Sequence, residues 1–237
     1  MTDHQEIYRE QAAQYELLVS REDYQQNIFR ALNQIMPFAG LNVADFGAGT
    51  GRLTCMMAPV VKHVYAFDHS LHMLSVAAEK LAKTDQNNWS VAVSDHRAMA
   101  IKSGVVDVAI SGWSVCYVVV DNPTNWQEEL PRALGELHRA VRPGGTIILL
   151  ETLGTGFETP EPPAHLLEYY AYLEAHGFQR EWIRTDYRFK DKAEAESSAG
   201  FFFGDEMVAK IKEDERGVIL PECTGIWWKE RGRDAER

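Results

Sequence analysis

Apolar and polar residues follow two different periods along the middle of the chain. Short apolar runs, each followed by a turn, predict β-strands. The segments between them carry apolar residues at the three- and four-residue spacing of amphipathic helices. The predicted strands are residues 41–46, 64–67, 89–93, 105–111 and 146–151, and the predicted helices start at residue 51, span 70–83 and span 126–141. Strands that alternate with helices in this way form a parallel sheet with helices on both faces.

The flanking segments predict further helices and strands. Residues 5–36 carry apolar side chains at helical spacing, which predicts two helices that end before Pro37. After the alternation come a helix, a sixth strand and a seventh strand, at residues 166–173, 179–189 and 218–229. Residues 230–237 are mostly charged and predict a frayed tail. The whole pattern predicts an α/β fold built on one sheet of seven strands.

The composition predicts a soluble protein that acts on small molecules. Its 237 residues fit one domain, and contents of 45% hydrophobic and 11% aromatic residues exclude a disordered chain. No apolar run approaches the ~18 residues of a membrane span, and residues 1–30 lack the basic head and apolar stretch of a secretory signal. A net charge of −11 repels a phosphate backbone, which disfavours nucleic acid as a partner. We therefore expect a cytoplasmic monomer or homodimer with a small-molecule substrate.

The cysteines and histidines predict neither disulfides nor a metal site. Cys55, Cys116 and Cys223 lie far apart without paired spacing, which favours reduced thiols. His69 and His72 have the spacing of two ligands on one helical turn, but no third ligand follows at helical spacing. We expect no metal ion.

The segment VADFGAGTG at residues 43–51 carries the strongest functional signal. Asp45 ends a predicted strand, and three alternate glycines follow it, at positions 47, 49 and 51. Glycines there allow positive φ and a close ligand, and the next helix presents unpaired N–H groups at its start. The spacing is G-x-G-x-G, and Arg52 stands where the dinucleotide fingerprint G-x-G-x-x-G needs its third glycine. The loop predicts a nucleotide-like ligand and disfavours an NAD-dependent oxidoreductase.

Four segments follow one another in order along the chain: VADFGAGTGRLT, VYAFDHSLHML with Asp68, VSDHRAMA with Asp95, and LHRAVRPGGTIILLE. Together they resemble the class I S-adenosylmethionine-dependent methyltransferases, in particular their small-molecule branch of methyltransferase type 11. The resemblance covers residues 40–152 well. It implies a Rossmann-like sheet of seven strands whose last strand is antiparallel, with S-adenosyl-L-methionine as cofactor. The implied organisation is one domain with an N-terminal helical cap (1–38), a cofactor-binding core (39–152) and a substrate-side half (153–237).

The resemblance also implies roles for individual residues in cofactor binding. Asp68 resembles the acid that accepts hydrogen bonds from both ribose hydroxyls, and Asp95 the acid that binds the adenine amino group, with the main-chain N–H of His96 reaching the ring. His69 and Met73 would face the adenine, although a methionine on a helix is also typical of a core. The remaining implied cofactor contacts are Asp45, Gly47, Ala48, Gly49 and Gly51 in the loop and Ser111, Gly112 and Trp113 near the methionine part. Asp45 would either hold the turn or accept hydrogen bonds from a ligand amine.

Two tyrosines near the N-terminus also resemble family residues. Tyr15 would close over the cofactor, and Tyr8 would lie at the substrate pocket. Both also fit the simpler interpretation of aromatic contacts on a surface helix.

The predicted substrate side contains a long connection at residues 190–217. Its 28 residues exceed an ordinary loop, which is typical of a lid. It carries Phe201, Phe202 and Phe203, followed by a helix from Asp205. Phe201 and Phe202 would line a substrate pocket together with Tyr117, although the phenylalanines also suit docking of the inserted helix on the sheet.

The sequence thus predicts a bacterial-type methyltransferase that moves a methyl group to a small molecule by in-line displacement in a closed pocket. Residues 111–114 read SGWS rather than the D/N-P-P-Y/F motif of base methylation, which again disfavours nucleic acid. No catalytic acid or base is assigned, and the acceptor atom stays open among O, N, C and S. The alternative is a non-catalytic domain that binds or senses S-adenosylmethionine, and a less favoured one is the oxidoreductase.

Overall fold

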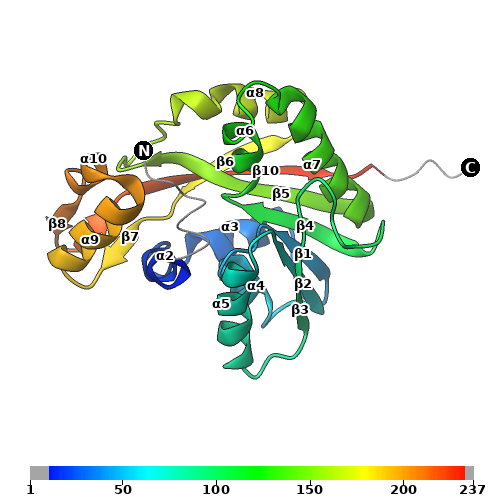
Figure 1. The fold of residues 1–237 in the computed structure, drawn as a ribbon, viewed down its shortest axis with the longest axis horizontal. Helices are drawn as coiled ribbons and strands as arrows, with labels where there is room; N and C mark the ends of the chain where they lie inside the picture. The colour runs from blue at the N-terminus through cyan, green and yellow to red at the C-terminus, as the bar shows by residue number, and fades with distance from the viewer. Residues whose placement is uncertain (1–10, 233–237) are drawn as a thin grey trace, which may run out of the picture. The chain divides into compact units, whose positions relative to one another are not determined.

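The main sheet has seven strands, as the sequence predicts. The computed structural model describes residues 11–232. The strands of this sheet are β1 (Asn42–Phe46), β2 (His63–Asp68), β3 (Trp89–Val93), β4 (Val106–Gly112), β5 (Val141–Thr155), β6 (Gln179–Arg184) and β10 (Glu222–Glu230). Their order is β3-β2-β1-β4-β5-β10-β6, with parallel pairing from β3 to β5 and one antiparallel strand, β10 (Figure 1). The predicted Rossmann-like fold class is confirmed.

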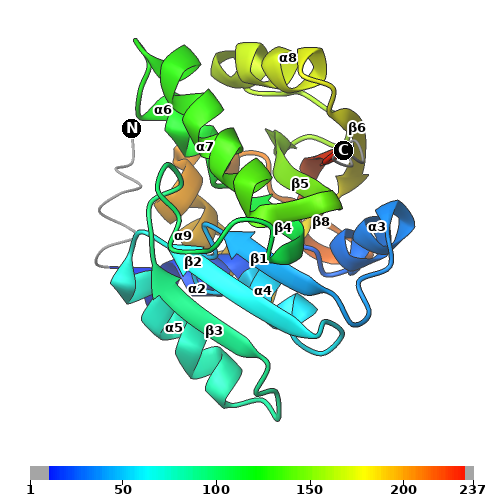
Figure 2. The same ribbon diagram turned by 90° about the vertical axis from the view of Figure 1, so that its right-hand side faces the viewer.

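Helices lie on both sides of the central strands of the sheet. The helices of the described residues are α2 (Ala12–Val19), α3 (Asn27–Ile35), α4 (Arg52–Met57), α5 (Leu71–Ala82), α6 (Val115–Val120), α7 (Trp126–Ala140), the 3₁₀ turn η1 (Ala164–Leu166), α8 (Leu167–Ala175), α9 (Lys192–Phe203) and α10 (Asp205–Val208). α4 and α5 pack beside β2 and β3, whereas α7 packs against β4 on the other side of the strands (Figure 2). None of the helices in the described part of the chain has the length and apolar character that a bilayer span requires.

The chain divides into two compact units. Unit 1 takes in the residues up to Pro37, Thr152–Pro163 and Trp182–Gly225, and unit 2 takes in Phe38–Glu151, Ala164–Glu181 and the residues from Ile226 onward. The boundary falls within β5, β6 and β10. The predicted single-domain organisation, with its cap, core and lid, stays a prediction.

Unit 2 owes its stability to apolar side chains on both faces of the central strands. Phe46 on β1 and Ile110 on β4 are fully buried, as are Leu81 on α5 and Leu137 on α7. β1 and β4 are buried along almost their whole length, which is typical of parallel strands covered by helices on both faces. Each of these side chains contributes about 1.5–3 kcal/mol through burial. The carboxyl ends of the strands are therefore fixed in register.

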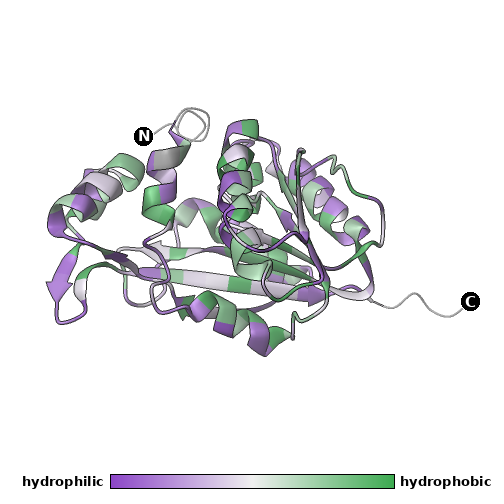
Figure 3. Cartoon of the chain, turned by 90° about the horizontal axis from the view of Figure 1, so that it is seen from below, coloured by the Kyte–Doolittle hydropathy of each residue, from purple (hydrophilic) through white to green (hydrophobic). Residues whose placement is uncertain are grey.

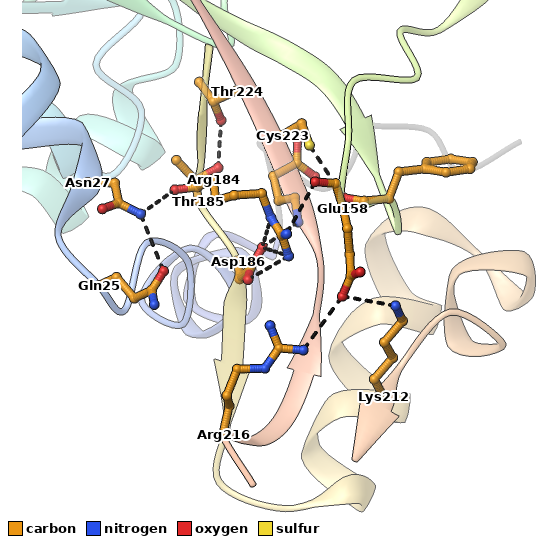
Figure 4. A network of polar contacts seen from close by, with 12 residues as sticks. Gln25, Asn27, Glu158, Arg184, Thr185, Asp186, Lys212, Arg216, Cys223 and Thr224 are labelled. Carbon is orange, nitrogen blue, oxygen red and sulfur yellow. Dashed lines mark hydrogen bonds and ion pairs between the residues drawn. The ribbon is translucent and has the colours of Figure 1, made fainter. Parts of the chain in front are cut away.

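The predicted sixth strand at residues 179–189 is wrong in its extent. β6 ends at Arg184, and the remainder forms β7 (Tyr187–Phe189) in a second sheet. Between the two strands, the buried Asp186 receives two hydrogen bonds from the Arg184 guanidinium, both 2.8 Å long (Figure 4). Asp186 also accepts the Glu222 N–H at 3.0 Å. These polar contacts fix the chain where it passes from one sheet to the other.

The predicted seventh strand at residues 218–229 is also two strands. Pro221 has no N–H to donate to a strand ladder, and the run divides there into β9 (Gly217–Leu220) and β10. β9 pairs with β7 and with β8 (Lys212–Asp214) in a three-stranded antiparallel sheet. β8 is exposed along its length and is coloured hydrophilic in Figure 3. The long connection at residues 190–217 thus contains α9, α10 and one strand of this small sheet.

α6 has no counterpart in the sequence prediction. Its residues, VCYVVV, include four valines, which favour strands because branching at Cβ suits a pleated surface. Val115, Cys116, Val118 and Val119 are buried in the helix. Tertiary burial therefore overrides local propensity at this segment.

Candidate cofactor site at the carboxyl edge of the sheet

The glycine loop after β1 has the backbone that its sequence predicts. Gly47, Gly49 and Gly51 have φ of 76°, 54° and 82°. The N–H groups of Gly47 and Ala48 both donate to the Phe67 carbonyl at 2.8 Å, which ties the loop to β2. α4 then starts at Arg52, so the loop leads directly into a helix N-terminus.

Two of the three glycines are also required by their neighbours. A Cβ on Gly47 would overlap the Oγ and Cβ atoms of Ser114, and one on Gly51 would lie 2.8 Å from the Ala77 Cβ. A Cβ on Gly49 would meet only the Met73 Cε atom, at 3.5 Å. Gly47 and Gly51 thus permit close packing as well as positive φ.

Asp45 is a fully buried carboxyl group beneath this loop. The Thr54 hydroxyl donates to its Oδ2 atom at 2.6 Å. Its Oδ1 atom is buried and has no hydrogen-bond partner within residues 11–232. Burial raises the pKa of Asp45 to about 7, because desolvation disfavours the charged form. The site therefore holds a buried acid with one unused acceptor atom.

Asp68 connects the glycine loop to α5. It lies at the end of β2 and is buried. Its Oδ2 atom accepts the Gly49 N–H and its Oδ1 atom accepts the Ser70 N–H, both at 2.8 Å. The Ser70 hydroxyl in turn accepts the Met73 N–H at the start of α5. Asp68 thus fixes the loop and the helix start relative to each other.

The two residues implied for the adenine face lie in different surroundings. The His69 side chain is 68% exposed, and its Nδ1 atom lies 3.5 Å from the Asp68 Oδ1 atom. Met73 is buried on α5, with its Cε atom near Gly49. Their roles toward an adenine stay predictions.

Asp95 follows β3 and forms a bidentate ion pair with Arg97. The Arg97 Nε and Nη2 atoms donate to its two carboxylate oxygens at 2.8 and 2.7 Å. Arg97 also donates to Glu129 on α7 at 2.9 Å. The hydrogen bonds from the guanidinium hold the pKa of Asp95 well below its usual range. The Asp95 side chain is 47% exposed, so it stays charged and open to solvent.

His96 contacts Ser114 across the glycine loop. Its Nε2 atom lies 2.7 Å from the Ser114 Oγ atom, and its Nδ1 atom is buried without a partner in the described part of the chain. The His96 Cε1 atom would lie 3.1 Å from a Cβ on Gly47. Burial lowers the pKa of His96, which favours the neutral imidazole. This side-chain contact was not predicted, because 18 residues separate its partners in the sequence.

The end of β4 and the residue after it complete the edge. The Ser111 hydroxyl donates to the Phe46 carbonyl at 2.7 Å, and a Cβ on Gly112 would lie 2.8 Å from the Leu53 Cδ1 atom. Trp113 has a positive φ of 50°, and its N–H donates to the Leu150 carbonyl at 2.7 Å.

Arg52 has a structural reason for standing where a dinucleotide fingerprint has glycine. Its guanidinium carbon lies 3.9 Å from the centroid of the Trp113 ring, so a cation–π contact joins α4 to the segment after β4.

These residues gather where open α/β sheets bind ligands. β1 lies between β2 and β4 and is parallel to both, so the strand order reverses direction between β1 and β4. Ligands bind such sheets outside the carboxyl ends of the strands at this reversal. The glycine loop follows β1, Asp68 ends β2, and residues 111–114 include the end of β4 and the residues after it.

A buried acid next to this edge was missed by sequence reasoning. Glu151 on β5 accepts the Cys116 N–H at 3.1 Å and the Tyr169 hydroxyl at 3.0 Å, both at its Oε1 atom. Its Oε2 atom is buried and has no partner among the described residues. Burial raises the pKa of Glu151 to about 7. A glutamate that ends the apolar run IILLE was the signal in the sequence.

Of the other residues predicted for the site, only Tyr117 among the described ones belongs to unit 2. Tyr8 lies outside the described residues. Tyr15 and Phe202 belong to unit 1, where their ring centroids are 5.5 Å apart. Phe201 lies in the last turn of α9 in the same unit, and Tyr117 is half-buried on α6 of unit 2. Their contacts with cofactor or substrate stay predictions. Within residues 11–232, no cluster of three or more His, Cys, Asp or Glu side chains is arranged to hold a metal ion.

Comparisons with known proteins agree with the fold and the motifs. Residues 44–149 match the family model described as a methyltransferase domain. The chain is 34% identical over 123 residues to a malonyl-[acyl-carrier protein] O-methyltransferase of Pectobacterium atrosepticum, covering 52% of this chain and 43% of that protein. It is 29% identical over 141 residues to a demethylmenaquinone methyltransferase of Clavibacter sepedonicus, covering 60% and 51%. The chain thus spans about half the length of these curated relatives.

The same fold occurs among solved structures. The YcgJ protein of Bacillus subtilis superposes with a TM-score of 0.60 at 12% identity, over 90% of this chain and all of that one. The segment that matches the family model, residues 44–149, begins in β1 and ends in β5, so it contains the glycine loop, Asp68 and Asp95. Over residues 44–149, somewhat less than half of its length, this chain is thus similar to the methyltransferase domain family.

Proposed function

We propose that this chain transfers a methyl group from S-adenosylmethionine to a small-molecule acceptor. The observation that carries the proposal is the acidic edge around the glycine loop. Asp45 offers an unused acceptor atom beneath the loop, and Asp68 lies buried beside it. S-adenosylmethionine, the methyl donor of the family, presents an ammonium group, a sulfonium and two ribose hydroxyls, all of which suit acidic acceptors.

Asp68 retains the capacity to bind a sugar while it holds the loop. Each carboxylate oxygen has two lone pairs, and each Asp68 oxygen accepts one backbone N–H. One lone pair on each oxygen therefore remains for a ribose hydroxyl. The two backbone hydrogen bonds fix the carboxylate, so little side-chain entropy is lost on binding.

The charge of the site favours this cofactor over a dinucleotide. Asp45, Asp68 and Asp95 lie at or just after the carboxyl ends of the neighbouring strands β1, β2 and β3, and the whole chain has a net charge of −11. Carboxylates attract a positively charged sulfonium and repel a pyrophosphate. The Asp45 carboxyl, two residues before the first glycine, lies buried beneath the loop that would carry the phosphates of a bound dinucleotide.

Other residues would hold the remaining parts of the cofactor. Those proposed are Asp95 and the His96 N–H for the adenine edge, His69 and Met73 for its face, and Ser111, Gly112 and Trp113 for the methionine part. Ser111 and Gly112 have fixed backbones because their strand pairs with β5. When bound, the cofactor supplies a methyl group on a positively charged sulfur.

The contribution of the protein to the reaction is alignment. In-line displacement needs the acceptor atom opposite the leaving sulfur, and correct positioning can supply about 7–11 kcal/mol of the barrier reduction. No general base is then obligatory. The names of the two curated relatives suggest an acyl thioester or a quinol as acceptor classes to test first.

The test is formation of S-adenosylhomocysteine by the whole chain with S-adenosylmethionine and one added acceptor at a time. The acceptors are a malonyl thioester, a naphthohydroquinone and a panel of small phenols and amines. Product that forms only when an acceptor is present supports the proposal. Cofactor binding without turnover on any member of the panel favours the non-catalytic alternative and contradicts the proposal.

Replacing Asp68 with asparagine should weaken S-adenosylmethionine binding at least tenfold, which corresponds to about 1.4 kcal/mol. Asparagine keeps one acceptor oxygen but loses the charge and the second acceptor, so the ribose contacts are weakened. The dissociation constant is measured by isothermal titration calorimetry.

The matched control is Asp85→Asn, which removes the same charge at an exposed position after α5. We expect its affinity for the cofactor to match that of the wild type. Thermal unfolding of both variants separates a binding defect from a folding defect. Unchanged affinity in Asp68→Asn would exclude Asp68 from the cofactor site.

A further inference from the structure

Unit 1 contains a pocket that the cofactor site does not use. Its volume is about 260 Å³, and it is open to solvent. The walls come from the end of β5 and the loop that follows it, from the last residue of α9 and from α10. All the lining residues belong to unit 1.

The lining of the pocket is mainly apolar and aromatic. Phe157, Pro163, Phe203 and Met207 supply its apolar surface. Aromatic faces favour a flat ring as ligand, and a methionine side chain adapts to different ring shapes. The lining therefore suits a ring compound better than a sugar or a peptide.

The polar groups of the pocket are few and do not include a cation. Glu161 is the one ionisable residue in the lining, and it is exposed. Thr155 adds a hydroxyl. Lys210 lies nearby, with its Nζ atom 4.5 Å from the centroid of the Phe157 ring, but it does not line the pocket. A neutral ligand with a hydroxyl group fits this arrangement, whereas a carboxylate would meet Glu161.

Hydrogen bonds hold the loop side of the pocket in place. The Gly156 N–H donates to the Pro221 carbonyl and the Glu161 N–H to the Leu153 carbonyl, both at 2.7 Å. The Glu158 carboxylate forms an ion pair with Lys212 at 3.1 Å, and its carbonyl accepts from Arg184 at 3.2 Å (Figure 4). The loop is thus anchored to three other segments of unit 1.

The helical side is held by packing. Phe203 makes an edge contact with Tyr187, with centroids 5.9 Å apart. Phe202, Phe203 and Val208 pack on a buried cluster formed by α2, β7, α9 and β9. Gly156 has φ of 83°, and a Cβ there would lie 3.2 Å from the Met207 sulfur. A pocket whose walls are fixed before a ligand arrives needs little reorganisation to bind one.

We infer that this pocket binds a neutral aromatic ring compound that carries a hydroxyl group. An apolar cavity of about 150 Å³ binds benzene, so the larger volume here accommodates two fused rings. The aromatic walls contact the ring faces, and Thr155 hydrogen-bonds the ligand hydroxyl. This inference goes beyond the proposed methyl transfer and does not depend on it, because it concerns a binding site within unit 1.

The probe is 1-naphthol, titrated into the whole chain without S-adenosylmethionine and followed by ligand-observed NMR and calorimetry. We expect a dissociation constant of about 0.1–1 mM, typical of a ligand of this size. Met207→Trp fills the pocket and should raise this constant at least tenfold. Glu206→Trp, on the same helix and outside the lining, should leave it within about twofold.

Two further experiments test whether the pocket prefers a neutral ligand with a hydroxyl group. Thr155→Val should weaken 1-naphthol binding about threefold or more while leaving naphthalene binding unchanged, because only the former loses a hydrogen bond. 1-Naphthoate should bind at least tenfold more weakly than 1-naphthol. The inference would be overturned if 1-naphthol did not bind, or if both tryptophan variants lost affinity for 1-naphthol equally. It would also be overturned if 1-naphthoate bound more tightly than 1-naphthol. Because no cofactor is present, these outcomes leave the test of methyl transfer unaffected.

Discussion

Replacing Gly47 with alanine is expected to lower the free energy of unfolding of the protein by about 3 kcal/mol or more. The φ of 76° at Gly47 is left-handed, which costs a residue with a Cβ about 1–2 kcal/mol. The new Cβ would also overlap the side chain of Ser114, and overpacking of this kind costs typically about 1–3 kcal/mol. The two costs are added because one is a clash of the new Cβ with its own backbone and the other is its overlap with the Ser114 side chain. Urea unfolding measures the loss.

Gly40→Ala is the matched control for the backbone contribution. Gly40 has nearly the same φ, 75°, but no atom lies within 4 Å of an added Cβ. Its substitution should therefore cost only about 1–2 kcal/mol. In a double-mutant cycle, Ser114→Gly should recover most of the additional loss in Gly47→Ala, since it removes the overlapping side chain. Equal losses at Gly40 and Gly47, without recovery, would contradict the close contact between the loop and Ser114.

Replacing Glu151 with glutamine is expected to change the free energy of unfolding, relative to the wild type, more favourably at pH 8 than at pH 5. The pKa of Glu151 is raised from 4.5 to about 7 by burial, and only the Cys116 and Tyr169 groups oppose this shift. Between these two values the folded state binds more protons than the unfolded state, so the stability of the wild type falls as pH rises. Glutamine cannot ionise, and this part of the pH dependence disappears.

The expected size follows from the shift. A displacement of this size corresponds to about 2–3 kcal/mol, so the stability of Glu151→Gln minus that of the wild type should rise by this amount between pH 5 and pH 8. Comparing the two pH values cancels any constant effect of burying an amide. Glu136→Gln provides a contrasting case, because the Arg139 guanidinium lowers the pKa of Glu136. The stabilisation from this ion pair is lost only below the ordinary pKa of a glutamate, so the difference between Glu136→Gln and the wild type should change little between pH 5 and pH 8. A pH-independent difference between Glu151→Gln and the wild type would show that Glu151 is not a buried, uncompensated acid.

The elements between β1 and β5, apart from α6, were predictable because local patterns determine them. Period-two and period-3.6 runs alternate there, and the glycine loop marks the turn between β1 and α4. The later strands depend on long-range partners instead. Whether residues 187–189 continue β6 depends on β9, some thirty residues further on, and on the buried Asp186. Pro221 was the one local signal that the predicted strand at residues 218–229 divides into β9 and β10, because proline lacks an N–H.

The candidate site was predictable in its backbone and less so in its side chains. The resemblance located Asp68 and Asp95 at strand ends, and the structure agrees with these positions. It did not indicate that Asp68 also holds the glycine loop, nor that His96 reaches Ser114. Glu151 escaped notice because a glutamate at a strand end is usually exposed, and burial depends on tertiary packing. Contacts between residues far apart in the sequence account for each of these omissions.

The central claim is that the edge around the glycine loop binds S-adenosylmethionine. The most direct test is calorimetric titration of the wild-type chain with S-adenosylhomocysteine, the demethylated product, and in parallel with NADH. We predict one site per chain for S-adenosylhomocysteine, with a dissociation constant that rises at least tenfold in Asp68→Asn, and no binding of NADH. Binding of NADH with no response to S-adenosylhomocysteine would contradict the account.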